Sequence, residues 1–179
     1  ENFIKMRCVE NHDQMRIQQR MGDQDKAMAW IAFAAFNKGP FFIYSGQESA
    51  DMNRPSLFDI DKINWGTYEL AELHAKLAAL KKDLAQVKGK LTFLAAQPCI
   101  QAVWEHGAES LYGIFNVTRC RGQIDVQLPD GTYEDLVDGD KFIIKEGQCC
   151  APESVYIVRY ALDASPKEFT TVLMDSHVE

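Results

Sequence analysis

Apolar positions change their spacing along the chain at about residue 89. Before that point, residues 4–9 and 41–44 are short apolar runs, which predict buried strands. Residues 27–36 are apolar nearly all round and rich in alanine, a pattern typical of a buried helix. Strand, helix and strand with tight connections form a βαβ unit, so the two strands should lie parallel.

A second helix is predicted over residues 64–87. Its apolar residues recur every three or four positions: Leu73, Leu77, Leu80, Leu84 and Val87. Gly89 follows as a C-cap. Residues 11–24 and 49–63 are polar and predict loops, with Asp23 or Asp25 as the N-cap of the helix that covers residues 27–36.

After Gly89 the apolar runs become short and are separated by turn residues such as Pro129-Asp130-Gly131. Seven short strands are predicted: residues 100–104, 112–117, 124–128, 133–137, 142–145, 155–160 and 169–174. This pattern favours an antiparallel β-sandwich. We therefore expect an α/β part over residues 1–88, followed by an all-β domain over residues 91–179.

Composition excludes few functions. The net charge of −7 argues against a nucleic-acid partner. The sequence has no run of about 18 apolar residues, so no membrane-spanning helix is expected. The five cysteines form no disulfide framework and no zinc spacing, so we interpret them as reduced packing or surface thiols and expect no metal site. Reduced thiols favour a cytoplasmic location and leave a secreted or periplasmic one open.

The candidate chemistry is concentrated in residues 9–16. Here an imidazole, a carboxylate and a guanidinium follow the first predicted strand within a few residues: His12, Asp13 and Arg16. Polar clusters at strand ends are where α/β barrels carry their catalytic groups. The structural alternative is that His12 and Asp13 form a loop pair that caps the following segment.

Three segments together resemble the α-amylase superfamily of glycoside hydrolases. They are Glu10-Asn11-His12-Asp13 with Arg16, then residues 39–48, then Pro55-Ser56-Leu57-Phe58-Asp59 with Ile63-Asn64-Trp65. In that family they correspond to a conserved segment, the last barrel strand with its turn, and the loop before the last barrel helix. The resemblance implies that residues 1–88 are the last two units of a (β/α)8 barrel and that residues 91–179 are a Greek-key β-sandwich.

The same resemblance implies roles for individual residues. Retaining glycosidases need a nucleophile and an acid/base, which in this family lie on earlier strands. Asp13 would be the third carboxylate, which stabilises the transition state. His12 and Asn11 would bind the sugar, Arg16 would be a substrate-contacting or structural cation, and Glu48 would be a structural residue near the site.

The implied substrate is an α-glucan such as starch or maltodextrin, and the implied partner is the N-terminal portion of the barrel. No cofactor is expected, although the resemblance leaves room for a calcium ion in that other portion. Whether the chain alone is an enzyme stays open, and we expect no hydrolase activity from it. The sequence does not separate hydrolase from transglycosidase, and it does not specify the linkage.

Two alternative functions remain. One is a non-catalytic carbohydrate-binding or structural module, for which an exposed aromatic row is needed on the β domain; its candidates are Tyr112, Tyr133, Tyr156 and Tyr160. The other is a degenerate, inactive amylase-like protein. We expect Phe58, Trp65 and Trp104 to pack in the core more readily than to contact sugar. The Asn116-Val117-Thr118 sequon is expected to be incidental.

Overall fold

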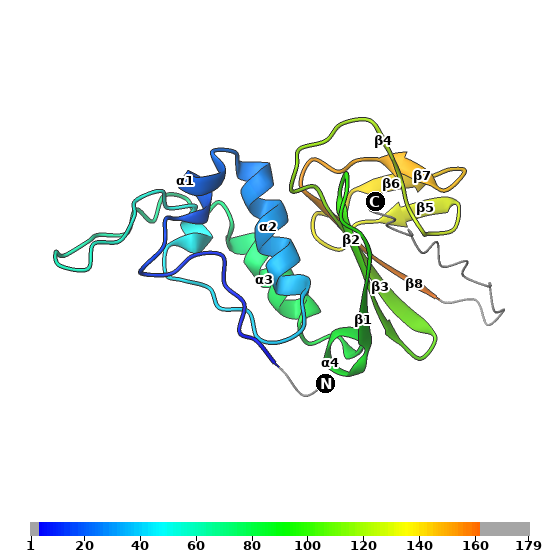
Figure 1. The fold of residues 1–179 in the computed structure, drawn as a ribbon, viewed down its shortest axis with the longest axis horizontal. Coiled ribbons are helices and arrows are strands. Elements are labelled where there is room, and N and C mark those ends of the chain that lie inside the picture. Colours follow the sequence, from blue (N-terminus) through cyan, green and yellow to red (C-terminus); the bar gives the residue numbers. More distant parts are fainter. Residues whose placement is uncertain (1–3, 162–179) are drawn as a thin grey trace, which may run out of the picture.

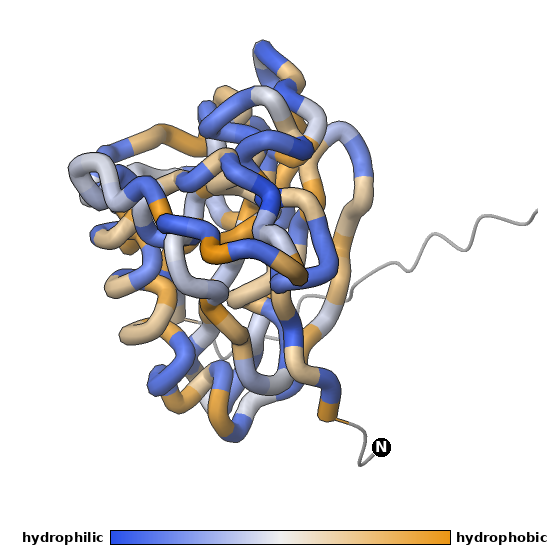
Figure 2. The backbone as a smooth tube through the Cα atoms, turned by 90° about the vertical axis from the view of Figure 1, so that its left-hand side faces the viewer, coloured by the Kyte–Doolittle hydropathy of each residue, from blue (hydrophilic) through white to orange (hydrophobic). Residues whose placement is uncertain are grey.

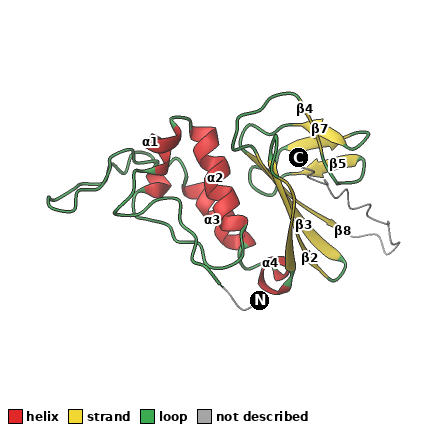
Figure 3. Ribbon diagram, viewed as in Figure 1, coloured by secondary structure: helices red, strands yellow, loops and turns green. Residues whose placement is uncertain are grey.

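The computed structural model describes residues 4–161. Helices lie on one side of the molecule and β-sheets on the other, as Figures 1 and 3 show. The helical part contains five short elements: α1 (Ile17–Met21), α2 (Gln24–Phe36), the 3-10 helix η1 (Gln47–Ser49), α3 (Ala71–Leu80) and α4 (Leu84–Lys88). No helix within residues 4–161 is long and apolar enough to cross a membrane.

The two segments predicted as strands lie parallel, as expected, but they pair through a single bridge between Arg7 and Phe41. Arg7 N donates to Pro40 O at 2.8 Å, and Phe42 N donates to Arg7 O at 2.7 Å. The expected burial is wrong, because Ile4, Met6, Phe42 and Ile43 are all exposed. Figure 2 shows the apolar start of the first of these segments in orange beside the N-terminal mark. Parallel strands are buried only when neighbouring strands and helices cover both faces.

Helix α2 confirms the helix expected over residues 27–36. Asp23 is its N-cap, with a carboxylate that accepts a hydrogen bond from Lys26 N at 2.8 Å. The helix ends at Asn37, whose N–H still donates to Phe33 O. The prediction of a loop over residues 11–24 is wrong at α1. This short helix has no side-chain cap of its own at Arg16 and ends at Gly22, which has a φ of 63°.

The single helix predicted over residues 64–87 is also wrong in its extent. It begins only at Ala71, and residues 81–83 interrupt it between α3 and α4. Asp83 starts α4, because its side chain accepts a hydrogen bond from Ala85 N at 2.9 Å. Leucine spacing does not reveal such a break, because it continues unchanged in the sequence to Leu84 and Val87, although both side chains are exposed in the structure. Gly89 caps the end of α4 as predicted.

The β part is the expected antiparallel sandwich. Its strands are β1 (Lys90–Ala95), β2 (Ile100–His106), β3 (Glu109–Phe115), β4 (Gln123–Asp125), β5 (Gly131–Glu134), β6 (Lys141–Ile144), β7 (Gln148–Cys150) and β8 (Val155–Ala161). One sheet has the order β1-β2-β3-β8, and the pairs β4-β7 and β5-β6 form two smaller sheets. Strands β1 and β7 were not predicted, and the strand predicted over residues 169–174 lies outside the described residues.

The four-stranded sheet is buried on both faces, and each face contributes to a different core. Successive residues of a strand point to opposite faces, so neighbouring residues join different cores. On β3, Leu111 and Phe115 join the core shared with α2, whereas Tyr112 and Ile114 join the core under the small sheets. Trp104 is buried in the first core, as predicted, and its indole N–H donates to Phe36 O at 2.7 Å.

No described strand pairs across residue 89. The core between α2 and the sheet nevertheless contains residues from both sides of that position. The division into domains at residues 88–91 therefore stays a prediction.

Cysteine reactivity should follow burial. All five cysteines are free, Cys99 and Cys149 are buried, and Cys150 is exposed. Burial raises the pKa of Cys149 to about 11 and that of Cys99 further, so both thiols resist forming the reactive thiolate. We expect a thiol reagent to modify Cys150 first in the native protein and to reach Cys99 and Cys149 only on unfolding. Time-resolved peptide mass spectrometry would measure this; equal rates at Cys99 and Cys150 would contradict it.

Candidate functional site

The polar cluster predicted from the sequence forms an exposed turn at the end of the first strand-like segment. Asn11 Oδ1 accepts a hydrogen bond from Asp13 N at 2.9 Å, and Gln14 N donates to Asn11 O at 3.2 Å. His12 Nε2 lies 3.3 Å from Asp13 Oδ2, and the Asp13 side chain is 65% exposed. The structure therefore brings His12 and Asp13 together with both side chains open to solvent.

The capping alternative for His12 and Asp13 is not supported. The helix that follows them is α1, and its Ile17 N donates at 2.7 Å to the carboxylate of Glu10 instead. Within residues 4–161, the Asp13 carboxylate contacts only His12. Both polar side chains are therefore free to meet a ligand at this turn.

Arg16 lies behind the turn, with only 3% of its side chain exposed. Its Nη1 donates to Glu10 Oε1 and to Ser45 O, both at 2.8 Å, and its Nε donates to Asn53 O at 3.1 Å. The guanidinium also lies 4.8 Å from the centroid of the Tyr44 ring. These contacts support the structural role of Arg16 among the two that the sequence left open. Its contact with substrate remains a prediction.

Glu10 and Asp51 are functional candidates that the sequence analysis missed. Both are buried, and Asp51 Oδ2 lies 3.4 Å from Arg16 Nη2. Asp51 is 35 residues from Arg16, so no local pattern could reveal the pair. Glu48, which was predicted near the site, has a structural contact. Its carboxylate accepts a hydrogen bond from Gly46 N at 2.9 Å and closes the turn after Tyr44.

The expectation that Phe58 and Trp65 pack in the core is wrong. Phe58 is 95% exposed and Trp65 is 41% exposed. Both lie on the loop between η1 and α3, which extends away from the helices in Figure 1. This loop ends before α3 begins at Ala71, so docking of the helix does not bury its aromatic side chains. The Phe58 ring is available for contact with a ligand, whereas the Trp65 ring is partly exposed and stacks on Tyr68, with ring centroids 5.8 Å apart.

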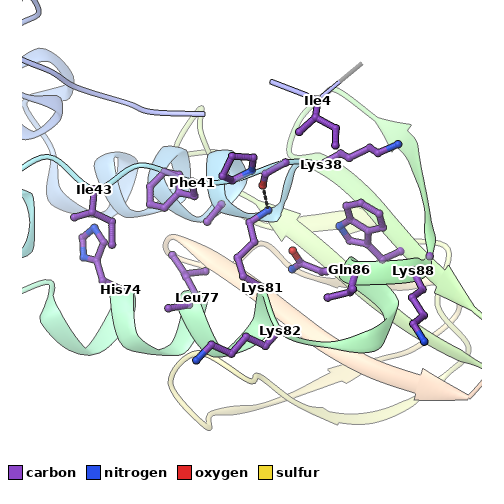
Figure 4. A pocket seen from close by; sticks show the side chains of 17 residues that line it. Ile4, Lys38, Phe41, Ile43, His74, Leu77, Lys81, Lys82, Gln86 and Lys88 are labelled. Atoms are coloured by element: carbon purple, nitrogen blue, oxygen red, sulfur yellow. Dashed lines mark hydrogen bonds between the residues drawn. The ribbon is translucent and has the colours of Figure 1, made fainter. Parts of the chain in front are cut away.

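A cavity of about 670 Å³ lies at the other end of the two strand-like segments. Ile4, Gly39 and Pro40 line it together with side chains from α3 and α4 (Figure 4). Catalytic groups of α/β barrels lie at the carboxyl ends of the strands, whereas these residues are at the amino ends. The cavity is therefore not the candidate site.

Two titratable side chains that line this cavity, His74 and Lys81, form hydrogen bonds with backbone carbonyl groups. His74 is buried on α3, its Nδ1 is 2.7 Å from Leu70 O, and burial lowers its pKa. Burial, together with the nearby Arg7, lowers the pKa of Lys81 to about 8. The Lys81 ammonium donates to Gly39 O at 2.8 Å. Within residues 4–161, no three His, Cys, Asp or Glu side chains are grouped as a metal site would require.

The β domain carries no exposed row of aromatic side chains in its described strands. Tyr112 is buried, and Phe142 stacks on Tyr156 with ring centroids 4.0 Å apart and also contacts Tyr133. The feature needed for a carbohydrate-binding module is therefore missing there. Asn116 is also buried, and its amide donates to Cys120 O and Pro152 O, which supports an incidental sequon.

Comparison with known proteins gives a family match to the β domain. Residues 91–158 match the model of the bacterial alpha amylase C-terminal domain. No curated protein matches the sequence.

Solved structures extend the similarity to most of the chain. An α-amylase from Lactobacillus plantarum is 22% identical, with a TM-score of 0.76 over 89% of this chain and 38% of its own. The maltogenic α-amylase AmyB from Thermotoga neapolitana is 25% identical, with a TM-score of 0.74 over 90% of this chain and 42% of its own. The α-amylase from Geobacillus thermoleovorans, solved with acarbose, is 17% identical, with a TM-score of 0.60 over 90% of this chain and 40% of its own.

The chain thus spans about two fifths of the length of these relatives. The similarity covers most of the chain and therefore includes residues of both the helical part and the antiparallel sandwich. The fold of the chain is thus similar to the last barrel units of α-amylases together with their C-terminal β domain, and residues 91–158 match the family of that domain.

Proposed function

We propose that this chain supplies the transition-state-stabilising carboxylate, Asp13, of a retaining glycosidase or transglycosidase that acts on α-glucans. The observation that carries the proposal is the position of Asp13, which is exposed beside His12 at the carboxyl end of a strand-like segment. The reaction develops positive charge on the sugar ring, and a fixed carboxylate stabilises that charge most in the transition state. His12 binds a hydroxyl of the same sugar.

The α-glucan substrate is supported by ligands of the relatives. The Geobacillus protein was solved with acarbose, and another similar structure, an AmyP variant, was solved with maltotriose. Maltotriose is a short α-glucan. In this chain, the exposed aromatic ring of Phe58 and the partly exposed ring of Trp65 suit the C–H surface of such sugars.

The nucleophile and the acid/base must come from the rest of the barrel. We propose that this portion docks along the edge formed by residues 4–7 and 41–44, where Ile4, Met6, Phe42 and Ile43 are exposed. An open, apolar strand edge is a template for further strand pairing. Pairing would bury these side chains and place the missing carboxylates opposite Asp13.

The 179-residue chain alone should therefore have no hydrolase activity. Two of the three carboxylates are absent, and hydrolysis without nucleophile and acid should be negligible. We expect no release of reducing sugar from maltooligosaccharides by the isolated chain, and measurable release when the same sequence is joined to the first six units of its barrel. Activity of the isolated chain that survives Asp13→Asn would contradict the proposal, as would an inactive joined protein that is correctly folded.

A further inference from the structure

We infer that Glu10 and Asp51 are positioning residues, which act through Arg16 to fix the turn that carries His12 and Asp13. The inference rests on the proposed role of Asp13. We name Glu10, Arg16 and Asp51 the Arg16 clamp. None of the three contacts the reacting atoms in this view, so each acts on catalysis through the placement of the turn.

The clamp joins the two ends of the turn. Glu10 immediately precedes the turn and is only 1% exposed. Its Oε1 accepts from Arg16 Nη1 at 2.8 Å, and its Oε2 accepts from Ile17 N at 2.7 Å. One buried carboxylate thus closes the loop of residues 11–15 by binding the two residues that follow it. The same bond caps the first turn of α1, which has no side-chain cap at Arg16.

The other side of Arg16 anchors the loop to the second strand-like segment. Arg16 donates to Ser45 O and Asn53 O, and Asp51 Oδ1 accepts from Asn53 N at 3.1 Å. Gly46, with a φ of 94°, allows this close approach, because a Cβ there would lie 3.1 Å from Arg16 Nη2. The clamp therefore fixes the catalytic turn against the turn that follows residue 44.

The exposed part of the turn has little else to hold it. Asp13 N bonds Asn11 Oδ1 and Gln14 N bonds Asn11 O, and both contacts are local to the turn. Local bonds give the turn its shape but do not place it relative to the rest of the site. Buried ion pairs contribute little to stability against apolar replacements, so their use here fits a positioning role better than a stabilising one.

Misplacement of the turn should slow catalysis. A shift of about 1 Å in a catalytic group costs on the order of a hundredfold in rate. Glu10→Gln removes the charge that holds Arg16 while keeping the size of the side chain. We expect this substitution in the joined barrel protein to lower kcat by about 10- to 100-fold with a smaller change in KM. Glu10→Asp, which keeps the charge, should restore part of the loss.

The direct test is backbone mobility in the 179-residue chain. Nitrogen-15 relaxation should give order parameters near 0.85 for the amides of His12 and Asp13, as for rigid backbone, and values below about 0.6 in Glu10→Gln. Amides of the β domain should not change. Glu72→Gln is the matched control, because Glu72 is exposed on α3 and the charge change is the same. Unchanged order parameters in a folded Glu10→Gln chain would overturn the inference.

If Glu10→Gln prevents folding, Asp51→Asn decides the question. Its contact with Arg16 is longer, at 3.4 Å, so the fold should survive while the turn gains mobility. Failure of Asp51→Asn to mobilise the turn, or its unfolding, would overturn the inference. The clamp and the proposed function fail separately: mobility that rises in Glu10→Gln while Asp13→Asn keeps full kcat would leave the clamp standing and remove the role of Asp13.

Discussion

Asp13→Asn should lower kcat of the joined barrel protein at least about a hundredfold, equivalent to about 3 kcal/mol of transition-state stabilisation. The charge that Asp13 balances is small in bound substrate and large in the oxocarbenium-like state, so kcat and kcat/KM should fall together. Folding should change little, because Asp13 is exposed and, in the part of the chain that the structure describes, its carboxylate contacts only His12. Steady-state kinetics on maltooligosaccharides and a thermal melt would measure both effects.

His12→Ala is the companion variant and should be milder. A hydrogen bond to a neutral hydroxyl contributes in both the ground state and the transition state, so KM should rise as well. Near-normal kcat in Asp13→Asn would show that the carboxylate is not part of the chemistry. A variant that fails to fold would show that Asp13 is a structural residue.

Arg16→Met should have the largest effect on stability. It leaves the carboxylates of Glu10 and Asp51 buried without their cation. Removing one partner from a buried ion pair costs about 3–5 kcal/mol. Urea unfolding of the 179-residue chain, followed by circular dichroism, would measure the loss as a lower midpoint at an unchanged slope.

Arg119→Met is the matched control for this stability measurement. Arg119 also has two acidic partners, Asp23 and Asp25, but its side chain is 33% exposed. An ion pair near the surface contributes about 0–1 kcal/mol, so this variant should unfold close to the wild type. Equal losses in the two variants would contradict the interpretation that burial makes the Arg16 contacts critical.

The sequence predicts the parts of this fold that depend on local patterns. Helix α2 is recognisable from its alanine-rich apolar run and from Asp23, which caps it as expected. Most strands of the sandwich follow from short apolar runs between turns. His12 and Asp13 come together because they are adjacent in the chain, so their contact needs no long-range information.

Features that depend on distant residues were not predictable in the same way. The break at residues 81–83 leaves the leucine spacing unchanged, and the exposure of Phe58 depends on how its loop projects. The contact between Arg16 and Asp51 joins residues with no shared pattern. Residues 41–44 are apolar enough for a buried strand, but within residues 4–161 their only strand pairing is the bridge to Arg7.

One measurement tests the central claim most directly. Calorimetry would give the affinities of two ligands, acarbose and maltotriose, for the joined barrel protein and for its Asp13→Asn variant. Acarbose carries a basic nitrogen at the bond to be cleaved and a flattened ring, whereas maltotriose resembles bound substrate. A carboxylate that acts on the transition state should matter far more for the first ligand. We expect Asp13→Asn to weaken the binding of acarbose at least about tenfold more than the binding of maltotriose. Equal weakening of both ligands, or of neither, would contradict the role assigned to Asp13.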